Sequence, residues 1–322
     1  MQLIVSVTSA CNLRCTHCPI DKENPNNLPI EAIKKLSTWD VSRIGILGGE
    51  PFLREDLPQI VDFFNDKPIT IYTNGILLSE HPEKIIEGVH YAVSMDGMQE
   101  NHDEMRGSGT WKKTYNALKV LSEKKDEGLI PSVWIRMTIT EKNSSDIKKI
   151  KKIADEFGIG VLYFPLLGIR TPFSPKFQLE LFKWASTQEN VSIYSPPFWQ
   201  FCGYKKSSCQ AGKWRLHVDV FGNVNPCQWF SEIILGNIYT HDYDFLKKKG
   251  EEFYNEFITI KEECEDCVRK ISCKGGCRLC PDSLTCPIKR RYFAQNVLDI
   301  DDIRLAETKH ERMFGNLKIV VC

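Results

Sequence analysis

Strand-like and helix-like segments alternate six times along residues 1–185, and this alternation limits the possible folds more than any other feature. The strand-like segments are rich in β-branched residues and span 2–8, 44–47, 69–72, 91–94, 133–140 and 160–164. Helical segments follow at 29–36, 57–65, 82–88, 111–126, 144–157 and 178–185. Successive βα units build a parallel sheet, because each helix returns the chain to the same edge. The sequence therefore predicts an α/β fold with a closed or partly closed (β/α)6 barrel.

Turn-forming and polar residues follow the first four predicted strands. They are a cysteine loop, then Gly-Gly-Glu-Pro at 48–51, Thr-Asn-Gly at 73–75 and Ser-Met-Asp-Gly at 94–97. Each of these runs can be an ordinary turn, since Gly, Asn and Asp are common turn residues. In such barrels, however, functional groups lie beyond the carboxyl ends of the strands. The shared position of the four runs predicts a single site there.

The cysteine loop has the spacing C-x3-C-x2-C, formed by Cys11, Cys15 and Cys18. Three thiolates can hold three irons of a [4Fe-4S] cluster and leave the fourth iron open, whereas electron-transfer clusters use four protein ligands. A structural zinc site usually takes four ligands in two close pairs. A disulfide framework suits small secreted chains, and this chain has no signal peptide. The spacing favours a cluster with one open iron.

The bulk composition excludes several classes of partner. The 42 basic and 42 acidic residues cancel, so no overall charge favours nucleic acid or a membrane surface. No apolar run has the length of a membrane span. Thirteen cysteines without a targeting segment predict metal ligands in a reducing compartment, and their odd number argues against complete disulfide pairing. We expect a cytoplasmic protein with no nucleic-acid partner and no membrane partner.

The cysteine spacing resembles the signature of the radical S-adenosylmethionine (SAM) superfamily, and the resemblance covers residues 1–185. It implies a partial (β/α)6 TIM-like barrel in which the catalytic loop, Cys11, Cys15 and Cys18, binds a [4Fe-4S] cluster. SAM would chelate the open iron. Reduced ferredoxin or flavodoxin would supply the electron that splits SAM, and the resulting 5′-deoxyadenosyl radical would abstract hydrogen from the substrate.

The resemblance also implies which residues contact SAM. The second strand end supplies Gly48, Gly49, Glu50 and Pro51. These residues resemble the family's GGE motif, in which glycines allow close approach of the methionine moiety and the carboxylate takes its α-ammonium. His17 stands where the family prefers an aromatic ring near the adenine, although exposure to solvent or ligation are alternatives. Thr73 and Asn74 are expected to line the same cavity, with turn formation as the competing explanation.

The fourth and fifth strands contribute the remaining predicted SAM contacts. Ser94 and Asp96 resemble a polar pair that binds ribose hydroxyls or the methionine carboxylate, and an Asp-Gly turn is the alternative. Arg106 and Arg136 are candidates for that carboxylate, and either can instead be a surface or ion-pairing arginine.

Ten of the thirteen cysteines follow residue 200, and their spacing resembles the SPASM extension of the same superfamily. The resemblance implies two auxiliary [4Fe-4S] clusters with four thiolates each. The first would use Cys202, Cys209, Cys227 and Cys277. The second would use Cys264, Cys267, Cys273 and Cys286. A pair of zinc ribbons is the alternative, and the x2-x5-x3 spacing is unusual for it. Cys280 and Cys322 are left over; we expect inert, buried thiols, with ligation or reactivity as the alternative.

The domain boundary is predicted from prolines at 172, 175, 196 and 197. They indicate a barrel over 1–185, a linker over 186–200 and a SPASM domain with a C-terminal tail over 201–322. Residues 215–226 have the pattern of a hairpin that carries the cysteine at 227.

The SPASM branch mostly modifies peptides, so the first hypothesis is a radical SAM oxidoreductase that oxidises or crosslinks a ribosomally made peptide. A tetrapyrrole or other small-molecule precursor is the alternative, followed by an iron–sulfur electron carrier. A sulfatase maturase is less favoured, because Gln228 stands where those enzymes carry an acid–base Asp. Only ten residues precede Cys11, so a peptide leader would be recognised by a separate leader-binding protein or by the core, if it is recognised at all.

Overall fold

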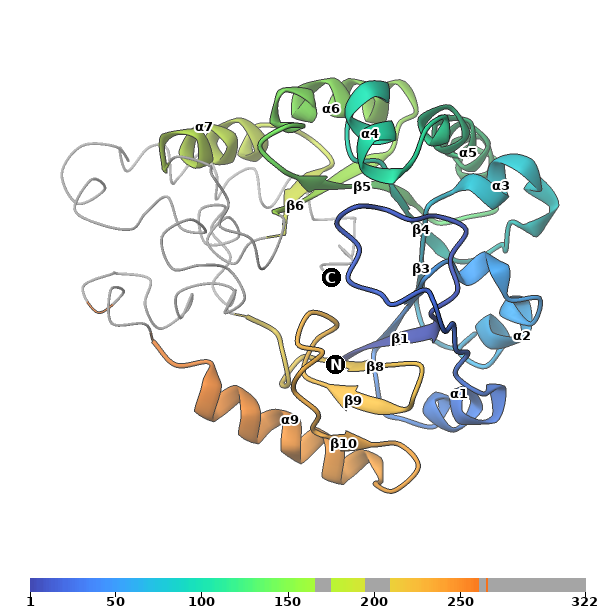
Figure 1. Cartoon of the computed structure of the whole chain (residues 1–322), viewed down its shortest axis with the longest axis vertical. Helices are drawn as coiled ribbons and strands as arrows, with labels where there is room; N and C mark the ends of the chain where they lie inside the picture. Colours follow the sequence, from blue (N-terminus) through green and yellow to red (C-terminus); the bar gives the residue numbers. More distant parts are fainter. Residues whose placement is uncertain (166–174, 195–208, 261–264, 266–322) are drawn as a thin grey trace.

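The computed structural model describes residues 1–165, 175–194, 209–260 and 265, and its strands form one sheet (Figure 1). The order of the strands across the sheet is β10-β9-β8-β1-β2-β3-β4-β5-β6-β7. Their bounds are β1 Gln2–Thr8, β2 Arg43–Gly48, β3 Ile69–Thr73, β4 His90–Ser94, β5 Val133–Ile139, β6 Gly160–Pro165, β7 Val191–Ile193, β8 Arg215–Val218, β9 Asn223–Asn225 and β10 Gly236–Asn237. Every pair from β8 through β1 to β7 is parallel, and β9 and β10 are antiparallel additions.

Helices follow the strands and lie along the outside of the sheet (Figure 1). Their bounds are α1 Ile30–Ser37, α2 Leu57–Asp62, α3 Ile76–Glu80, α4 Gln99–Arg106, α5 Thr110–Asp126, α6 Ile147–Glu156, α7 Pro175–Ser186 and α9 Tyr243–Phe257, with 3-10 turns at Pro51–Leu53, Pro82–Lys84 and Ser144–Asp146. The predicted alternation of six strands and helices is confirmed. The mostly parallel sheet with outer helices is the α/β architecture of a partial barrel.

Two local predictions differ from the structure. A helix was expected at 82–88, but the helix after β3 begins directly at Ile76, and Pro82–Lys84 makes only a 3-10 turn. Gly75 adopts φ +80° and starts this early helix, so the polar run at 73–75 is a helix entry. Helix α4 was not predicted, because its sequence QENHDEMR is polar almost throughout and shows little helical periodicity.

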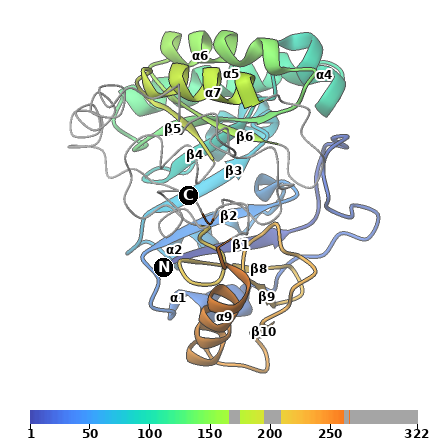
Figure 2. The same ribbon diagram turned by 90° about the vertical axis from the view of Figure 1, so that its left-hand side faces the viewer.

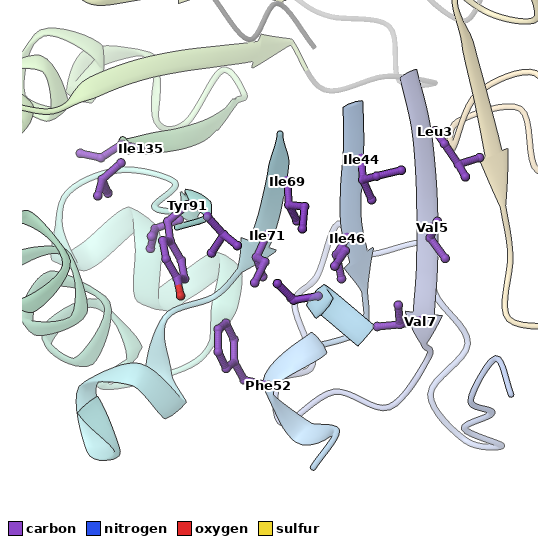
Figure 3. Packing of buried hydrophobic residues seen from close by; sticks show 14 of the residues in the cluster. Leu3, Val5, Val7, Ile44, Ile46, Phe52, Ile69, Ile71, Tyr91 and Ile135 are labelled. Atoms are coloured by element: carbon purple, nitrogen blue, oxygen red, sulfur yellow. The ribbon is translucent and has the colours of Figure 1, made fainter. Parts of the chain in front are cut away.

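The main core lies between the sheet and its outer helices. Leu3, Val5 and Val7 of β1 share the face that carries Ile44 and Ile46 of β2 (Figure 3). Side chains alternate along a strand, so the residues between these point to the inner face of the sheet. The inner face of β1 therefore carries Gln2, Ile4, Ser6 and Thr8, most of which are polar. Full burial of each core Ile or Leu on the other face contributes about 1.5–3 kcal/mol.

The segment after residue 208 continues the same sheet. Strand β8 pairs in parallel with β1, and β8 and β9 form the predicted hairpin, with Val218 opposite Val224. Strand β7, which lies within the predicted linker, pairs with β6. Both views place α9 beside the β8 to β10 end of the sheet (Figures 1 and 2). No helix of the described ranges combines the length and the apolar character that crossing a bilayer requires.

Candidate functional site

The three cysteines of the predicted cluster lie on the loop between β1 and α1, held by two backbone hydrogen bonds from the end of β2. The amide of Gly49 donates to the carbonyl of Thr8, and the amide of Glu50 donates to the carbonyl of Ala10, both at 2.8 Å. A Cβ atom on Gly49 would lie 2.0 Å from the Ala10 oxygen, and one on Gly48 would lie 2.1 Å from the Thr8 oxygen. Only glycine permits this close contact between loop and strand end.

Glu50 connects the ends of β2 and β3 from a fully buried position. Its Oε1 accepts hydrogen bonds from the hydroxyl of Thr73 at 2.7 Å and the amide of Phe52 at 3.3 Å, and its Oε2 accepts from the amide of Asn74 at 2.8 Å. Burial raises the pKa of Glu50 to about 7, although these hydrogen bonds favour the ionised form. The Nδ2 of Asn74 donates to Oδ1 of Asn12, 2.8 Å away, which brings the β3 end to the cysteine loop.

Asp96 and Arg106 form a buried ion pair beside the same loop. Nε of Arg106 donates to Oδ2 of Asp96 at 2.6 Å, and Oδ1 of Asp96 accepts from the amide of Thr138 at 2.7 Å. Burial by itself would raise the pKa of Asp96, but the charge of Arg106 and the hydrogen bonds hold it below its ordinary value. Nη1 of Arg106 lies 4.0 Å from Sγ of Cys15, so the pair reaches the cysteine loop directly.

Two histidines approach this ion pair. Nε2 of His17 lies 3.6 Å from Oδ2 of Asp96, and its Nδ1 is buried without a hydrogen-bond partner among the described residues. Burial lowers the pKa of His17, although Asp96 opposes the shift. Nδ1 of His102 accepts the amide hydrogen of Asp96 at 3.1 Å, and burial lowers the pKa of His102 to about 4. Both rings are therefore neutral near pH 7.

Ser94 and Arg136 lie side by side in the register of β4 and β5, on the inner face of the sheet. The guanidinium of Arg136 stacks over the ring of Phe164 at 4.1 Å and lies 5.2 Å from that of Tyr72 and 5.9 Å from that of Trp229. Cation–π contacts of this kind hold an arginine in an apolar setting. Trp229 follows Cys227 by two residues, so the C-terminal part of the chain reaches the interior of the barrel.

Of the predicted auxiliary-cluster ligands, the structure describes Cys209 and Cys227. Both are buried in a small apolar cluster with Phe230, Tyr254 and other side chains. Sγ of Cys227 donates to Oε1 of Gln228 at 3.3 Å. The other cysteines after residue 200 lie outside the described residues, namely Cys202, Cys264, Cys267, Cys273, Cys277, Cys280, Cys286 and Cys322.

The cysteine loop carries three thiols that could each bind one iron of a cluster. Within the described ranges, no three His, Cys, Asp or Glu side chains converge closely enough to hold one metal ion. The ligands of a four-iron cluster lie further apart, because each cysteine binds a different iron. Cys11, Cys15 and Cys18 are free and partly exposed. Partial burial raises the pKa of Cys11 and Cys15, so binding of iron would displace a proton from each thiol.

Several residues at this end of the sheet had no sequence signal. Asn12 links the cysteine loop to β3, and buried Asn143 donates to the carbonyls of Asp96 at 2.9 Å and Thr138 at 2.8 Å. These are loop asparagines whose partners come from other strands. The contact of His102 with Asp96 likewise depends on how α4 folds back onto the end of β4.

A protein-family model described as the radical SAM superfamily matches residues 5–154. The chain is 32% identical over 167 residues to the Fe-coproporphyrin III synthase of Methanosarcina barkeri, covering 48% of this chain and 41% of that protein. It is 28% identical over 276 residues to the antilisterial bacteriocin subtilosin biosynthesis protein AlbA of Bacillus subtilis, covering 74% and 58%. It is 24% identical over 302 residues to the mycofactocin maturase MftC of Mycobacterium tuberculosis, covering 84% and 76%. The chain thus spans less than two thirds of the length of the first two relatives.

Two solved structures share the fold. Native anSMEcpe with bound AdoMet and Kp18Cys peptide aligns with a TM-score of 0.69 at 22% identity, covering 98% of each chain. Streptococcus suis SuiB bound to precursor peptide SuiA aligns with a TM-score of 0.68 at 16% identity, covering 86% of this chain and 72% of that one. At these identities the likeness establishes the α/β fold with a mostly parallel sheet and does not by itself establish an activity.

Proposed function

Because residues 5–154 form a radical SAM domain, we propose that this protein is a radical SAM enzyme that oxidatively modifies or crosslinks a ribosomally made peptide. The family implies a [4Fe-4S] cluster and SAM, which together supply a 5′-deoxyadenosyl radical that abstracts hydrogen from the substrate. The observation that carries the proposal is the convergence of polar groups from β2, β3 and β4 on a loop with three free cysteines.

The residues around the loop have distinct proposed tasks. Cys11, Cys15 and Cys18 hold the cluster. Gly48 and Gly49 keep the strand end in contact with the loop, since a side chain on either would collide with it. Glu50 presents a buried carboxylate to the α-ammonium of SAM, and a cation beside it would favour its ionised form. Pro51 begins the buried 3-10 turn behind it.

The ion pair organises the other side of the site. Asp96 fixes the guanidinium of Arg106 beside Cys15, where Arg106 can bind an anionic group of SAM. His17 lies against Asp96 with an unpartnered Nδ1 that can bind adenine. Ser94 and Arg136 face the interior and are assigned to the SAM carboxylate. Thr73 and Asn74 hold Glu50 in place and line the same cavity.

The remaining assignments concern the C-terminal part. We assign residues 1–185 to the barrel, 186–200 to a linker that contributes β7 to the sheet, and 201–322 to a SPASM domain with two auxiliary [4Fe-4S] clusters, whose strands β8 to β10 extend the same sheet. The burial of Cys209 and Cys227 together in one cluster supports this assignment. Reduced ferredoxin or flavodoxin would donate the electron in a reducing cytoplasm. A separate leader-binding protein would hold the substrate where the substrate carries a leader.

The share of this chain that each relative covers favours peptide substrates over tetrapyrroles. The tetrapyrrole enzyme matches 48% of this chain, whereas the bacteriocin protein and the mycofactocin maturase match 74% and 84%. The longer alignments extend beyond the barrel that binds SAM. Because a substrate class depends on more than the SAM-binding half, the longer matches carry more weight.

The test is anaerobic reconstitution with iron and sulfide, followed by reduction with dithionite in the presence of SAM. The wild type should release 5′-deoxyadenosine, and a variant with alanine at all three loop cysteines should release none. Mass spectrometry of peptides encoded by adjacent genes should then detect products lighter by two hydrogens. Absence of 5′-deoxyadenosine from the wild type would refute the enzyme class, and modification of a tetrapyrrole precursor in place of any peptide would refute the substrate class.

A further inference from the structure

Three polar side chains form a hydrogen-bonded chain on the inner face of the sheet, apart from the predicted SAM contacts. Oγ of Ser6 lies 2.8 Å from Nε2 of His217, and Nδ1 of the same ring lies 3.2 Å from Oδ1 of Asn225. The residues come from β1, β8 and β9, which are successive neighbours in the sheet. We call these three residues the Ser6 relay.

The surrounding hydrogen bonds determine which nitrogen of His217 carries the proton. Nδ2 of Asn225 donates to the carbonyls of Ile233 at 2.9 Å and Ser231 at 3.3 Å, so its Oδ1 must face the imidazole. An amide oxygen only accepts, and Nδ1 of His217 is therefore the protonated nitrogen. Nε2 then keeps its lone pair and accepts a hydrogen bond from the hydroxyl of Ser6. A hydroxyl aligned with a fixed imidazole acceptor is the geometry of general-base catalysis.

Ser6 is the accessible end of the relay. Val5 and Val7 belong to the core between sheet and helices, so Ser6 points to the inner face. It is partly exposed, whereas His217 and Asn225 are 6% and 1% exposed. The cysteine loop begins directly after β1 ends at Thr8, two residues beyond Ser6 on the same face. A substrate held near the loop and inside the barrel can therefore reach the hydroxyl.

We propose that the Ser6 relay accepts the proton that the peptide substrate loses during its oxidation; this inference rests on the proposed function. The substrate gives one hydrogen atom to the 5′-deoxyadenosyl radical, one electron to an iron–sulfur cluster and one proton to the Ser6 oxygen. Ser6 passes its own hydroxyl proton to Nε2 of His217. The substrate thus loses two hydrogens and two electrons in total, and no other reactant is needed. Ser6 is the catalytic residue, and His217 and Asn225 are positioning residues.

The electrostatic setting keeps His217 neutral at pH 7 but makes it a weak base. Burial lowers the pKa of His217 to about 4, against smaller opposing effects of the Asn225 hydrogen bond and the charge of Asp219. The ring is neutral at pH 7 and ready to accept. A weak base suffices because of what happens to the substrate radical. When a carbon-centred radical loses an electron it becomes a cation, and an X–H group next to that carbon becomes strongly acidic. Gln228 beside Cys227 cannot accept a proton, and Arg136 on the inner face is a cation.

The first test measures the ring itself. In 15N-histidine-labelled, reconstituted enzyme at pH 7.5, His217 should show a protonated Nδ1 and a bare Nε2 by 15N NMR. The His217 signals are assigned by their absence from the spectrum of the His217→Gln variant. In Ser6→Ala the Nε2 resonance should shift toward that of an imidazole nitrogen that accepts no hydrogen bond. A protonated Nε2, or a resonance unchanged by Ser6→Ala, would overturn the relay.

The second test separates the relay from SAM cleavage. Enzyme, SAM, dithionite and a synthetic library of dodecapeptides are incubated, and oxidised peptide formed per 5′-deoxyadenosine is measured by mass spectrometry. Ser6→Ala and His217→Gln should lower this ratio at least tenfold while SAM cleavage continues, and Ser6→Thr should restore it. The matched control is Ser132→Ala, which removes a 2.7 Å hydrogen bond to Nδ1 of His90 at the opposite end of the strands and should leave the ratio unchanged.

The outcomes are distinguishable. Unchanged ratios in Ser6→Ala and His217→Gln would overturn the relay and leave the enzyme class standing. A wild type that cleaves SAM but oxidises no library peptide would count against the peptide substrate and the relay together. A wild type that does not cleave SAM would overturn the proposed function itself.

Discussion

Replacing Gly49 by alanine should detach the cysteine loop from the end of β2. The new Cβ would lie 2.0 Å from the carbonyl oxygen of Ala10, so the loop must move by at least about 1 Å to relieve the overlap. That shift breaks the hydrogen bonds from the amides of Gly49 and Glu50 to Thr8 and Ala10, both 2.8 Å long. Each bond contributes about 0.5–1.5 kcal/mol. Overpacking adds about 1–3 kcal/mol, so local destabilisation should reach roughly 2–6 kcal/mol.

The assay is the iron content of the anaerobically reconstituted protein, together with release of 5′-deoxyadenosine. With three clusters the wild type should bind about twelve irons, and Gly49→Ala about eight, because the loop can no longer present its thiols together. The control is Gly88→Ala, which meets nothing within 4 Å and carries only the strain of φ +75°. It should keep its iron. A Gly49→Ala variant with full iron and full SAM cleavage would refute the close-contact argument.

Four further predictions follow from the site. Alanine at all three loop cysteines should abolish SAM cleavage and leave about eight irons by iron assay, and retained cleavage would refute the ligand assignment. Burial raises the pKa of Glu50 from 4.5 to about 7, so its contribution to stability is complete below pH 4.5 and is lost as the pH rises through 7. Between pH 5 and 8 the unfolding free energy of the wild type should fall by about 2–3 kcal/mol relative to that of Glu50→Gln in urea titrations, and parallel pH profiles would contradict this. Asp96→Asn leaves Arg106 buried without its carboxylate and should cost about 3–5 kcal/mol in the same titrations, and a cost near zero would contradict the buried pair. Gln228→Asp should not confer sulfatase-peptide maturation, and a variant that oxidises such a peptide by mass spectrometry would show that one carboxylate decides the substrate.

Local patterns were sufficient for the architecture and for the positions of the motifs. Hydrophobic periodicity predicted six βα units, and topology then placed each motif at one end of the sheet. The prediction failed where the local signal was weak. The helix after β3 starts at Ile76, since Gly75 provides the left-handed residue before it, and polar α4 has no apolar stripe to mark it.

The partners within the site could not be predicted in the same way. The sequence identifies Glu50 and Asp96 as polar residues at strand ends. It does not show that Glu50 is enclosed by the β3 turn or that Asp96 pairs with Arg106 from α4. Such contacts depend on the register between strands and on how a helix folds back, and neither leaves a local pattern.

The amino-acid sequence by itself determined the alternating fold, the cysteine spacing and the end of the sheet at which the motifs gather, because each depends on residues close together in the chain. Only the tertiary structure decided that Ser6 and His217 meet across 211 positions and that Asn225 orients the ring between them. Strand β8 pairs with β1 in one register, and the hydrogen bond exists because that register places the two side chains on the same inner face.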